Sequence, residues 1–318
     1  MRALRSLLAL ALVGCVGRPD DGPTWRETWE MLVATDDGGL IDARITVGNT
    51  GIYKGQGHLR LDRWRAKDSP INFARTTAPA DAGVWAERDR VRVGPDRLGV
   101  ERRGWTLRVT DTETSAVVHL EDSGGPRPEA STKSQRIGSW TQSIPLSAGT
   151  ASGWLEAGAR GGAVSGHGLV TYRGGDGGMQ WPRRAVYVLG GADTSIGVDD
   201  HGENHLRWGQ IDGQELVMDD AKLSLGPEGA LVLDLRPAED VQIELYARDT
   251  GGRTDPHRGL SDLEAQVLRT LGGPPVRRVT LLQGTLIGTD TRVRLPAILV
   301  EVAHEDALLA LKPRRRIR

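Results

Sequence analysis

The densest group of side chains able to do chemistry lies at residues 199–205, where two histidines and three carboxylates fall within seven residues. Imidazole and carboxylate are common ligands of Zn²⁺ and similar divalent ions. The spacing of His201 and His205 suits one metal ion on a helix, but Gly202 between them is typical of a turn. We therefore favour a polar hairpin tip in solvent, and we predict no metal and no other cofactor.

Three other positions are candidate sites of binding or catalysis. His167 lies between two glycines, where the backbone can approach a ligand closely; the alternative is a histidine bonded to a neighbouring strand. Residues 255–257 contain an Asp and a His, but a Pro-rich loop gathers such residues by chance. Asp219 and Asp220 are adjacent, so on a strand they face opposite sides. No nucleophile elbow, P-loop or CxxC motif occurs, and we predict no catalytic residue. Whether the protein is an enzyme is left open, and a non-enzymatic role is favoured.

Cys15 is the only cysteine of the 318-residue chain and follows a short apolar stretch. Arg2 and Arg5 give a positive start, and Leu7 to Val13 form an apolar run too short to span a bilayer. The arrangement resembles a bacterial lipoprotein signal, in which the cysteine becomes the acylated N-terminus. We therefore expect a membrane anchor at Cys15 in the cell envelope, in the outer membrane if the cell is Gram-negative; an ordinary secretory signal is the alternative.

Composition excludes several classes of function. The 41 basic and 42 acidic side chains balance, so no overall field favours nucleic acid, and we predict no nucleic-acid partner. After the N-terminal segment no apolar run approaches the ~20 residues of a transmembrane helix. The nine Trp are many against one Phe, and their large apolar area suits either core packing or contact with a ligand.

The elements that must position these side chains are mostly β-strands. Residues 241–248 alternate apolar and polar side chains, as a half-buried strand does. Similar alternation recurs along the chain between Gly-rich turns, which favours an all-β sandwich or barrel. One segment differs, because Ser261 and Glu264 form a capping box ahead of apolar residues at helical spacing. We predict one short amphipathic helix over Ser261–Leu271.

The chain also divides into two similar halves. Gly55-Gln56-Gly57-His58 in the first half is echoed by Gly166-His167-Gly168 in the second, and Gly-x-Gly in a strand suits a sharp bend or bulge. A loop-like stretch separates the two halves. We predict a signal and tether at 1–22, domains at 23–150 and 151–311, and a basic tail at 312–318.

These residues resemble a known group of proteins. Trp25-Arg26-Glu27-Thr28-Trp29, Gly166-His167-Gly168 and the hairpin Trp208-Gly209 with Asp212-Gly213 are similar to motifs of tandem lipocalin-like (calycin) proteins. That family includes the hydroxyneurosporene synthase or carotenoid hydratase type and the survival-factor type. The resemblance implies two tandem lipocalin-like antiparallel barrels, with the short helix in the second half, and a lipid-handling role.

One departure from the family bears on function. Hydratases of this kind carry an Asp-His-Asn-Trp run soon after the Gly-x-Gly, whereas here Gly168 is followed by residues 169–176 without His or Trp. The acid that a hydratase needs is therefore absent from its expected place. We predict an envelope lipoprotein that binds or carries an apolar, lipid-like ligand, with His167, Leu169, Tyr172 and Trp208 as ligand-binding residues. A hydratase- or isomerase-type enzyme and a non-catalytic envelope scaffold are the alternatives.

Overall fold

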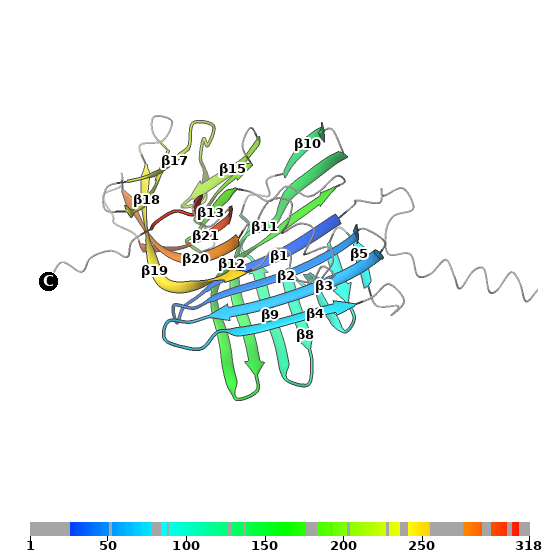
Figure 1. Cartoon of the computed structure of the whole chain (residues 1–318). Helices are drawn as coiled ribbons and strands as arrows, with labels where there is room; N and C mark the ends of the chain where they lie inside the picture. Colours follow the sequence, from blue (N-terminus) through cyan, green and yellow to red (C-terminus); the bar gives the residue numbers. More distant parts are fainter. Residues whose placement is uncertain are drawn as a thin grey trace, which may run out of the picture.

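A computed structural model gives the fold (Figure 1). It describes residues 26–50, 53–77, 84–87, 89–125, 129–135, 138–175, 183–191, 193–201, 204–226, 229–235, 241–254, 276–287, 294–303 and 307–311. Four predicted features lie outside these residues: Cys15, the pair at 255–257, the helix at Ser261–Leu271 and the tail at 312–318.

The described chain folds into two antiparallel sheets, and none of it forms a helix long and apolar enough to cross a membrane. The first sheet has the order β4-β3-β2-β1-β12-β11-β9-β8-β7-β6-β5, with β10 paired to β11. Its strands are β1 (Arg26–Thr35), β2 (Leu40–Thr50), β3 (Tyr53–Trp64), β4 (Ile71–Thr77), β5 (Val84–Glu87), β6 (Arg90–Val93), β7 (Asp96–Glu101), β8 (Gly104–Thr110), β9 (Thr114–Asp122), β10 (Glu129–Gln135), β11 (Gly138–Ala157) and β12 (Arg160–Gly175).

The second sheet has the order β16-β15-β14-β13-β21-β20-β19-β18-β17. Its strands are β13 (Arg184–Leu189), β14 (Ser195–His201), β15 (Asn204–Ile211), β16 (Gln214–Glu215), β17 (Lys222–Leu225), β18 (Leu231–Asp234), β19 (Gln242–Thr254), β20 (Val276–Ile287) and β21 (Arg294–Ala303). The alternation at residues 241–248 falls on β19, where Ile243 and Leu245 enter the core of this sheet, so the predicted strand is confirmed.

The first sheet curls around an apolar core of its own. Alternate residues of β1, namely Trp29, Met31 and Val33, point into this core with side chains from the other strands. β3 lies near β5 and β6, which belong to the opposite edge of the sheet. Arg75 on β4 also bonds Asp96 on β7 at 2.7 Å, which helps to hold the two edges together.

The switch between sheets lies beyond the predicted boundary near residue 150. That residue is inside β11, and both β11 and β12 pair within the first sheet. β12 lies beside β1 over the register from Arg26↔Gly175 to Thr35↔Gly166. The first sheet therefore extends to Gly175, and the second begins at Arg184.

The two sheets pack face to face, as Figure 1 shows with the first in blue to green and the second in green to red. Side chains from both meet in one apolar layer, which we call the interface cluster. It contains Leu32, Ala34, Leu40, Trp64, Ile144 and Leu169 from the first sheet, and Ala185, Tyr187, Leu189, Leu206, Trp208, Val279, Leu281, Ile298 and Val300 from the second.

Gly166 shows why the Gly-x-Gly stretch needs glycine. Its φ is +151°, and an added Cβ would lie 2.2 Å from the backbone oxygen of Ala34 on β1. A Cβ at Gly168 would lie 2.5 Å from the backbone oxygen of Leu32. The two glycines therefore let β12 approach β1 closely.

Candidate functional site

The structure brings only part of the predicted ligand set together. Leu169 and Trp208 meet in the interface cluster, and Trp208 lies against Tyr187 with ring centroids 5.8 Å apart. Tyr172 faces the other way, because its ring packs on Trp29 at 5.1 Å within the region of the first core. These residues therefore lie on both faces of the first sheet rather than around one cavity.

His167 lies on the same side of β12 as Leu169. Its ring reaches the turn between β13 and β14, where its Cε1 would lie 3.7 Å from a Cβ added at Gly191. Its Nδ1 is buried and has no hydrogen-bond partner within the part of the chain that the structure describes. The predicted alternative, a histidine bonded to a neighbouring strand, is not seen for this nitrogen.

The residues of the group at 199–205 do not share one environment. Asp199 is fully buried in the contact between the sheets, whereas Asp200 is half-buried, and the side chains of His201 and His205 lie outside the description. Among the described residues no three His, Cys, Asp or Glu side chains are close enough to hold a metal ion. Asp199 instead joins a network of buried charges that sequence reasoning missed.

One half of this network is built around Arg277 of β20. Arg277 is fully buried, and its two terminal nitrogens donate to Asp42 on β2 and to Glu30 on β1. A cation of the second sheet is thus held by two carboxylates of the first. Such a group is costly to bury alone, and the paired carboxylates offset that cost.

The other half is built around Asp199 of β14. Arg173 on β12 approaches Asp199 at 3.3 Å, and the Gln142 amide on β11 donates to the same carboxylate. Arg173 also lies 3.3 Å from the Tyr187 hydroxyl and 3.5 Å from Glu30. Here a carboxylate of the second sheet is held by donors of the first. In the Arg277 half, by contrast, the second sheet supplies the cation and the first sheet the carboxylates.

Burial and pairing shift the acids of the network in different directions. Burial alone would raise the pKa of Glu30, but Arg277, Arg173 and Arg44 outweigh it and hold that pKa below its ordinary value. Burial raises the pKa of Asp199 despite Arg173 and the hydrogen bonds from Tyr187 and Gln142. Burial also raises the pKa of Asp42 despite Arg277. Asp42 and Asp199 are therefore both candidate proton donors of the network, and Asp199 is the one that contacts Tyr187, whose ring lies against Trp208.

The first core is filled by the protein itself. Trp29, Met31 and Leu61 are each fully buried, so no water-sized cavity lies against them. Trp105 belongs to the same core, and Trp64 and Trp208 belong to the interface cluster. These Trp residues serve packing, so a ligand site must be sought at the edge of the cores.

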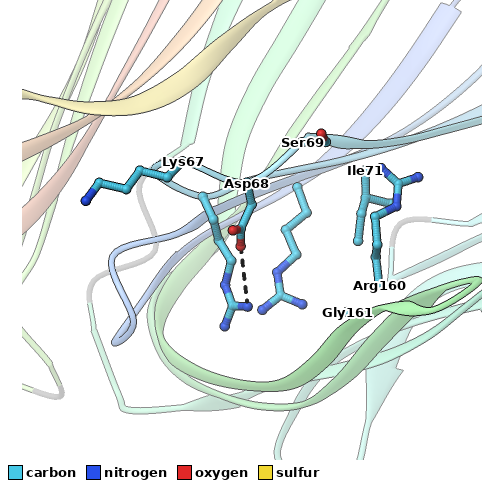
Figure 2. Close-up of a pocket in the computed structure, with 8 residues that line it drawn as sticks. Lys67, Asp68, Ser69, Ile71, Arg160 and Gly161 are labelled. Atoms are coloured by element: carbon cyan, nitrogen blue, oxygen red, sulfur yellow. Dashed lines mark ion pairs between the residues drawn. The ribbon is translucent and has the colours of Figure 1, made fainter.

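A pocket of about 370 Å³ opens at one end of the first sheet. We call it the rim pocket; it is formed where the turn between β3 and β4 meets the start of β12 (Figure 2). Its lining residues are Arg63, Arg65, Lys67, Asp68, Ser69, Ile71, Arg160 and Gly161. Ile71 also belongs to the first core, so the pocket borders the apolar interior.

Cations outnumber acids in the rim pocket. Four lining residues are Arg or Lys and one, Asp68, is a carboxylate. Arg65 lies 3.9 Å from Asp68 and also pairs with Asp37 in the turn between β1 and β2. Sequence reasoning did not single out this site, although three basic residues alternate at 63, 65 and 67, because Arg160 joins them only through the fold.

Comparisons with known proteins agree on the fold. No protein-family model matches the sequence, and no curated protein is a significant sequence relative. A crystal structure of CghA with Sch210972 matches at a TM-score of 0.55 and 11% identity, over 90% of this chain and 90% of that chain. A second CghA crystal structure matches at 0.54 and 12%, again over 90% of each chain. A putative AttH from Nitrosomonas europaea matches at 0.51 and 8%, over 86% of this chain and 91% of that one.

These matches place the protein in a structural class. The described chain is all-β, with two antiparallel barrel or half-barrel sheets, and shares its fold with these structures; the predicted fold class is confirmed, and the predicted short helix lies outside the described residues. At identities this low the similarity extends to the fold alone. The chemistry must be argued from this chain's own residues.

Proposed function

We propose that the protein binds or carries a small, lipid-like molecule, and that the rim pocket is where it does so. The observation that carries this proposal is the pocket itself: about 370 Å³, at the end of a curled sheet, beside the apolar core residue Ile71. Ligand pockets are typically ~300–1,000 Å³, and the mouths of β-barrels are common places for them. The rim pocket meets both conditions.

The fold adds general support. Small β-barrels hold single small ligands in many proteins, and one crystal structure of CghA, which has this fold, contains Sch210972. The proposed ligand here is lipid-like, with an apolar part against the edge of the first core. The four ligand residues expected from sequence lie elsewhere, and their role in binding stays a prediction.

Anchoring at Cys15 is the second part of the proposal. Lipidation would hold the protein at a membrane, where a lipid-like ligand is found. Cys15→Ser removes the thiol that acylation requires. We expect this variant to lose incorporation of labelled fatty acid and to leave the membrane fraction; unchanged labelling would contradict the anchor.

Filling the rim pocket tests the binding function. Ser69 is exposed and lines the pocket, so Ser69→Trp should occupy the space that a ligand needs. The matched control is Thr112→Trp, at an exposed turn between β8 and β9. Mass spectrometry of lipids that co-purify with each protein should show a bound species in the parent and control that is lost in Ser69→Trp. Absence of any bound lipid in the parent would favour a scaffold.

A second candidate function is an enzyme of the hydratase or isomerase type. The observation that favours it is Asp199, whose pKa burial raises and which accepts a hydrogen bond from Tyr187, itself packed against Trp208. Incubating the co-purified lipid with fresh protein tests this directly. An enzyme would convert the lipid to a product, Asp199→Asn would stop the conversion, and recovery of unchanged lipid would exclude this function for that lipid.

A further inference from the structure

The rim pocket is lined by a guanidinium group, that of Arg63, to which the described residues give no hydrogen bond. The Arg63 side chain is only 2% exposed, and none of its three nitrogens donates a hydrogen bond within the described chain. Its nearest acid is Asp37, whose Oδ2 lies 3.5 Å from Nη2. Asp37 already accepts from Arg65, so its charge is shared between two cations.

A buried guanidinium without acceptors is unfavourable. Each N–H that loses water must find another acceptor, or the protein loses the free energy of that hydration. Arg277 shows the usual solution, because its two terminal nitrogens donate to two carboxylates. Arg63 has five N–H groups. Among the described residues Asp68 acts on it only through its charge, and the carboxylate within 4 Å, that of Asp37, is shared with Arg65. The unused N–H groups point to an acceptor supplied from outside the chain.

Two further cations, Lys67 and Arg160, line the pocket from different turns, and Figure 2 shows the Lys67 ammonium directed outward. Arg160, at the start of β12, donates from Nη1 to the backbone oxygen of Pro70 at 3.2 Å, and this bond ties the two sides of the pocket together. The described residues offer no carboxylate to Arg160 or to Lys67. Figure 2 shows Lys67 and Arg160 on opposite sides of the pocket, with Asp68 between them.

We propose that the rim pocket recognises a phosphate-type oxyanion. Guanidinium groups bind phosphate through pairs of parallel N–H···O bonds, and Lys adds a point charge. A tetrahedral anion can accept from several directions at once, as cations placed on separate turns require. The phosphate would be either the head of a lipid or part of a free phosphate ester, and the same cations would serve both.

This inference rests on the proposed function only in treating the rim pocket as a ligand site. It adds the group that is recognised, and it stands or falls separately. A neutral lipid displaced by Ser69→Trp would support the proposed function and overturn the phosphate. Phosphate binding in a protein that carries no lipid would do the reverse.

Calorimetric titration with glycerol 3-phosphate and with inorganic phosphate tests the proposal. All proteins carry Cys15→Ser in the full chain, so that acyl chains do not contribute. Arg160→Gln and Lys67→Gln change exposed side chains and should fold normally; each should weaken binding at least tenfold, and Arg63→Gln should abolish it. The matched control is Arg97→Gln on β7, whose side chain is 55% exposed and pairs with Glu101, and it should bind like the parent.

Vesicles distinguish the two sources of phosphate. Sedimentation with neutral phosphatidylcholine vesicles is compared with vesicles that also contain phosphatidic acid. Binding only to phosphatidic acid vesicles, lost in Arg160→Gln, identifies a lipid headgroup; binding of soluble glycerol 3-phosphate identifies a free ester. If neither probe binds, or if the pocket variants and Arg97→Gln bind alike, the proposal is wrong.

Discussion

Arg277 and Arg173 are the two cations that form ion pairs between the two sheets. Arg277 crosses to Glu30 and Asp42, and Arg173 meets Asp199 from the other side. Each is almost fully buried, so neither has water as an alternative partner. The stability of the contact therefore depends on these ion pairs.

Removing Arg277 should be strongly destabilising. Arg277→Met keeps much of the apolar stem but removes the cation that Glu30 and Asp42 share, leaving Arg173 at 3.5 Å from Glu30 as a remaining ion pair of these two buried carboxylates in the described chain. Breaking a buried pair in this way costs ~3–5 kcal/mol. Urea unfolding should show that loss, whereas Arg97→Gln, at an exposed pair on β7, should change stability by less than ~1 kcal/mol. Equal effects of the two variants would contradict the role given to the network.

The two acids Glu30 and Asp199 should give opposite pH dependence. The pKa of Glu30 is lowered from 4.5, so it contributes stability above that pH that is lost as the pH falls through its folded-state pKa. The pKa of Asp199 is raised from 3.8, so its ionisation costs stability as the pH rises from 3.8 through the raised value.

Unfolding of two variants between about pH 3 and pH 7 measures these signs. Relative to the parent, Glu30→Gln should become less stable as the pH rises, and Asp199→Asn should become more stable over its own window. Asp89→Asn, at a turn where the side chain is 63% exposed, controls for the loss of one charge. Parallel profiles for Glu30→Gln and Asp199→Asn would show that the two acids do not differ as described.

The strands β12 and β1 show what a single element contributes. Their continuous register places Arg173 and Leu169 toward the second sheet and Tyr172 toward the first core. Gly166 lies at one end of this register. Glycine is needed there because a side chain would collide with the β1 backbone. A substitution at Gly166 should therefore disturb side-chain packing on both faces of the sheet.

Gly166→Ala and Gly162→Ala make a matched pair on β12. Both residues have positive φ, +151° and +136°, so both variants carry backbone strain of ~1–3 kcal/mol. A Cβ at Gly162 meets nothing within 4 Å, whereas one at Gly166 lies 2.2 Å from a backbone oxygen. Gly166→Ala should therefore be less stable by a further ~1–3 kcal/mol in thermal or urea unfolding. Equal losses would mean that β12 can move away from β1 at little cost.

The elements were more predictable than the site. Alternation identified β19 because Ile243 and Leu245 face one core and the opposite side chains are only half-buried. It was uninformative about β1, whose residues after Arg26 are all buried, because Glu30 faces the second sheet instead of water. Glu30 and Arg277 are separated by 247 positions, and no local pattern reports such a pairing. The rim pocket depends in the same way on Arg160 meeting the turn after β3.

At the scale of the whole molecule, the interface cluster and the charge network make the sheets one cooperative unit. If either sheet unfolded alone, the side chains of the interface cluster on the other sheet would lose their apolar burial, and the buried charges would lose their partners. The predicted division near residue 150 would moreover separate β12 from β1, since β12 belongs to the first sheet.

Calorimetry of the intact protein should therefore show one unfolding transition, with equal calorimetric and van't Hoff enthalpies. Arg277→Met should lower its midpoint without splitting it, because both sheets lose the same contact. Two separate transitions in the parent protein would show that the sheets are energetically independent, contrary to this expectation.

The order of strands also determines when the protein can become complete during synthesis. The pairing of β1 with β12 cannot form until residues 166–175 have been synthesised. The pairing of β13 with β21 likewise requires residues 297–301. Pairings over such long separations close late and slowly. A ribosome that stops before β21 thus releases a chain whose central strand β13 has an open edge, the kind of edge on which chains aggregate. We therefore expect chains truncated before β21 to aggregate or to be degraded by proteases more readily than the full-length chain.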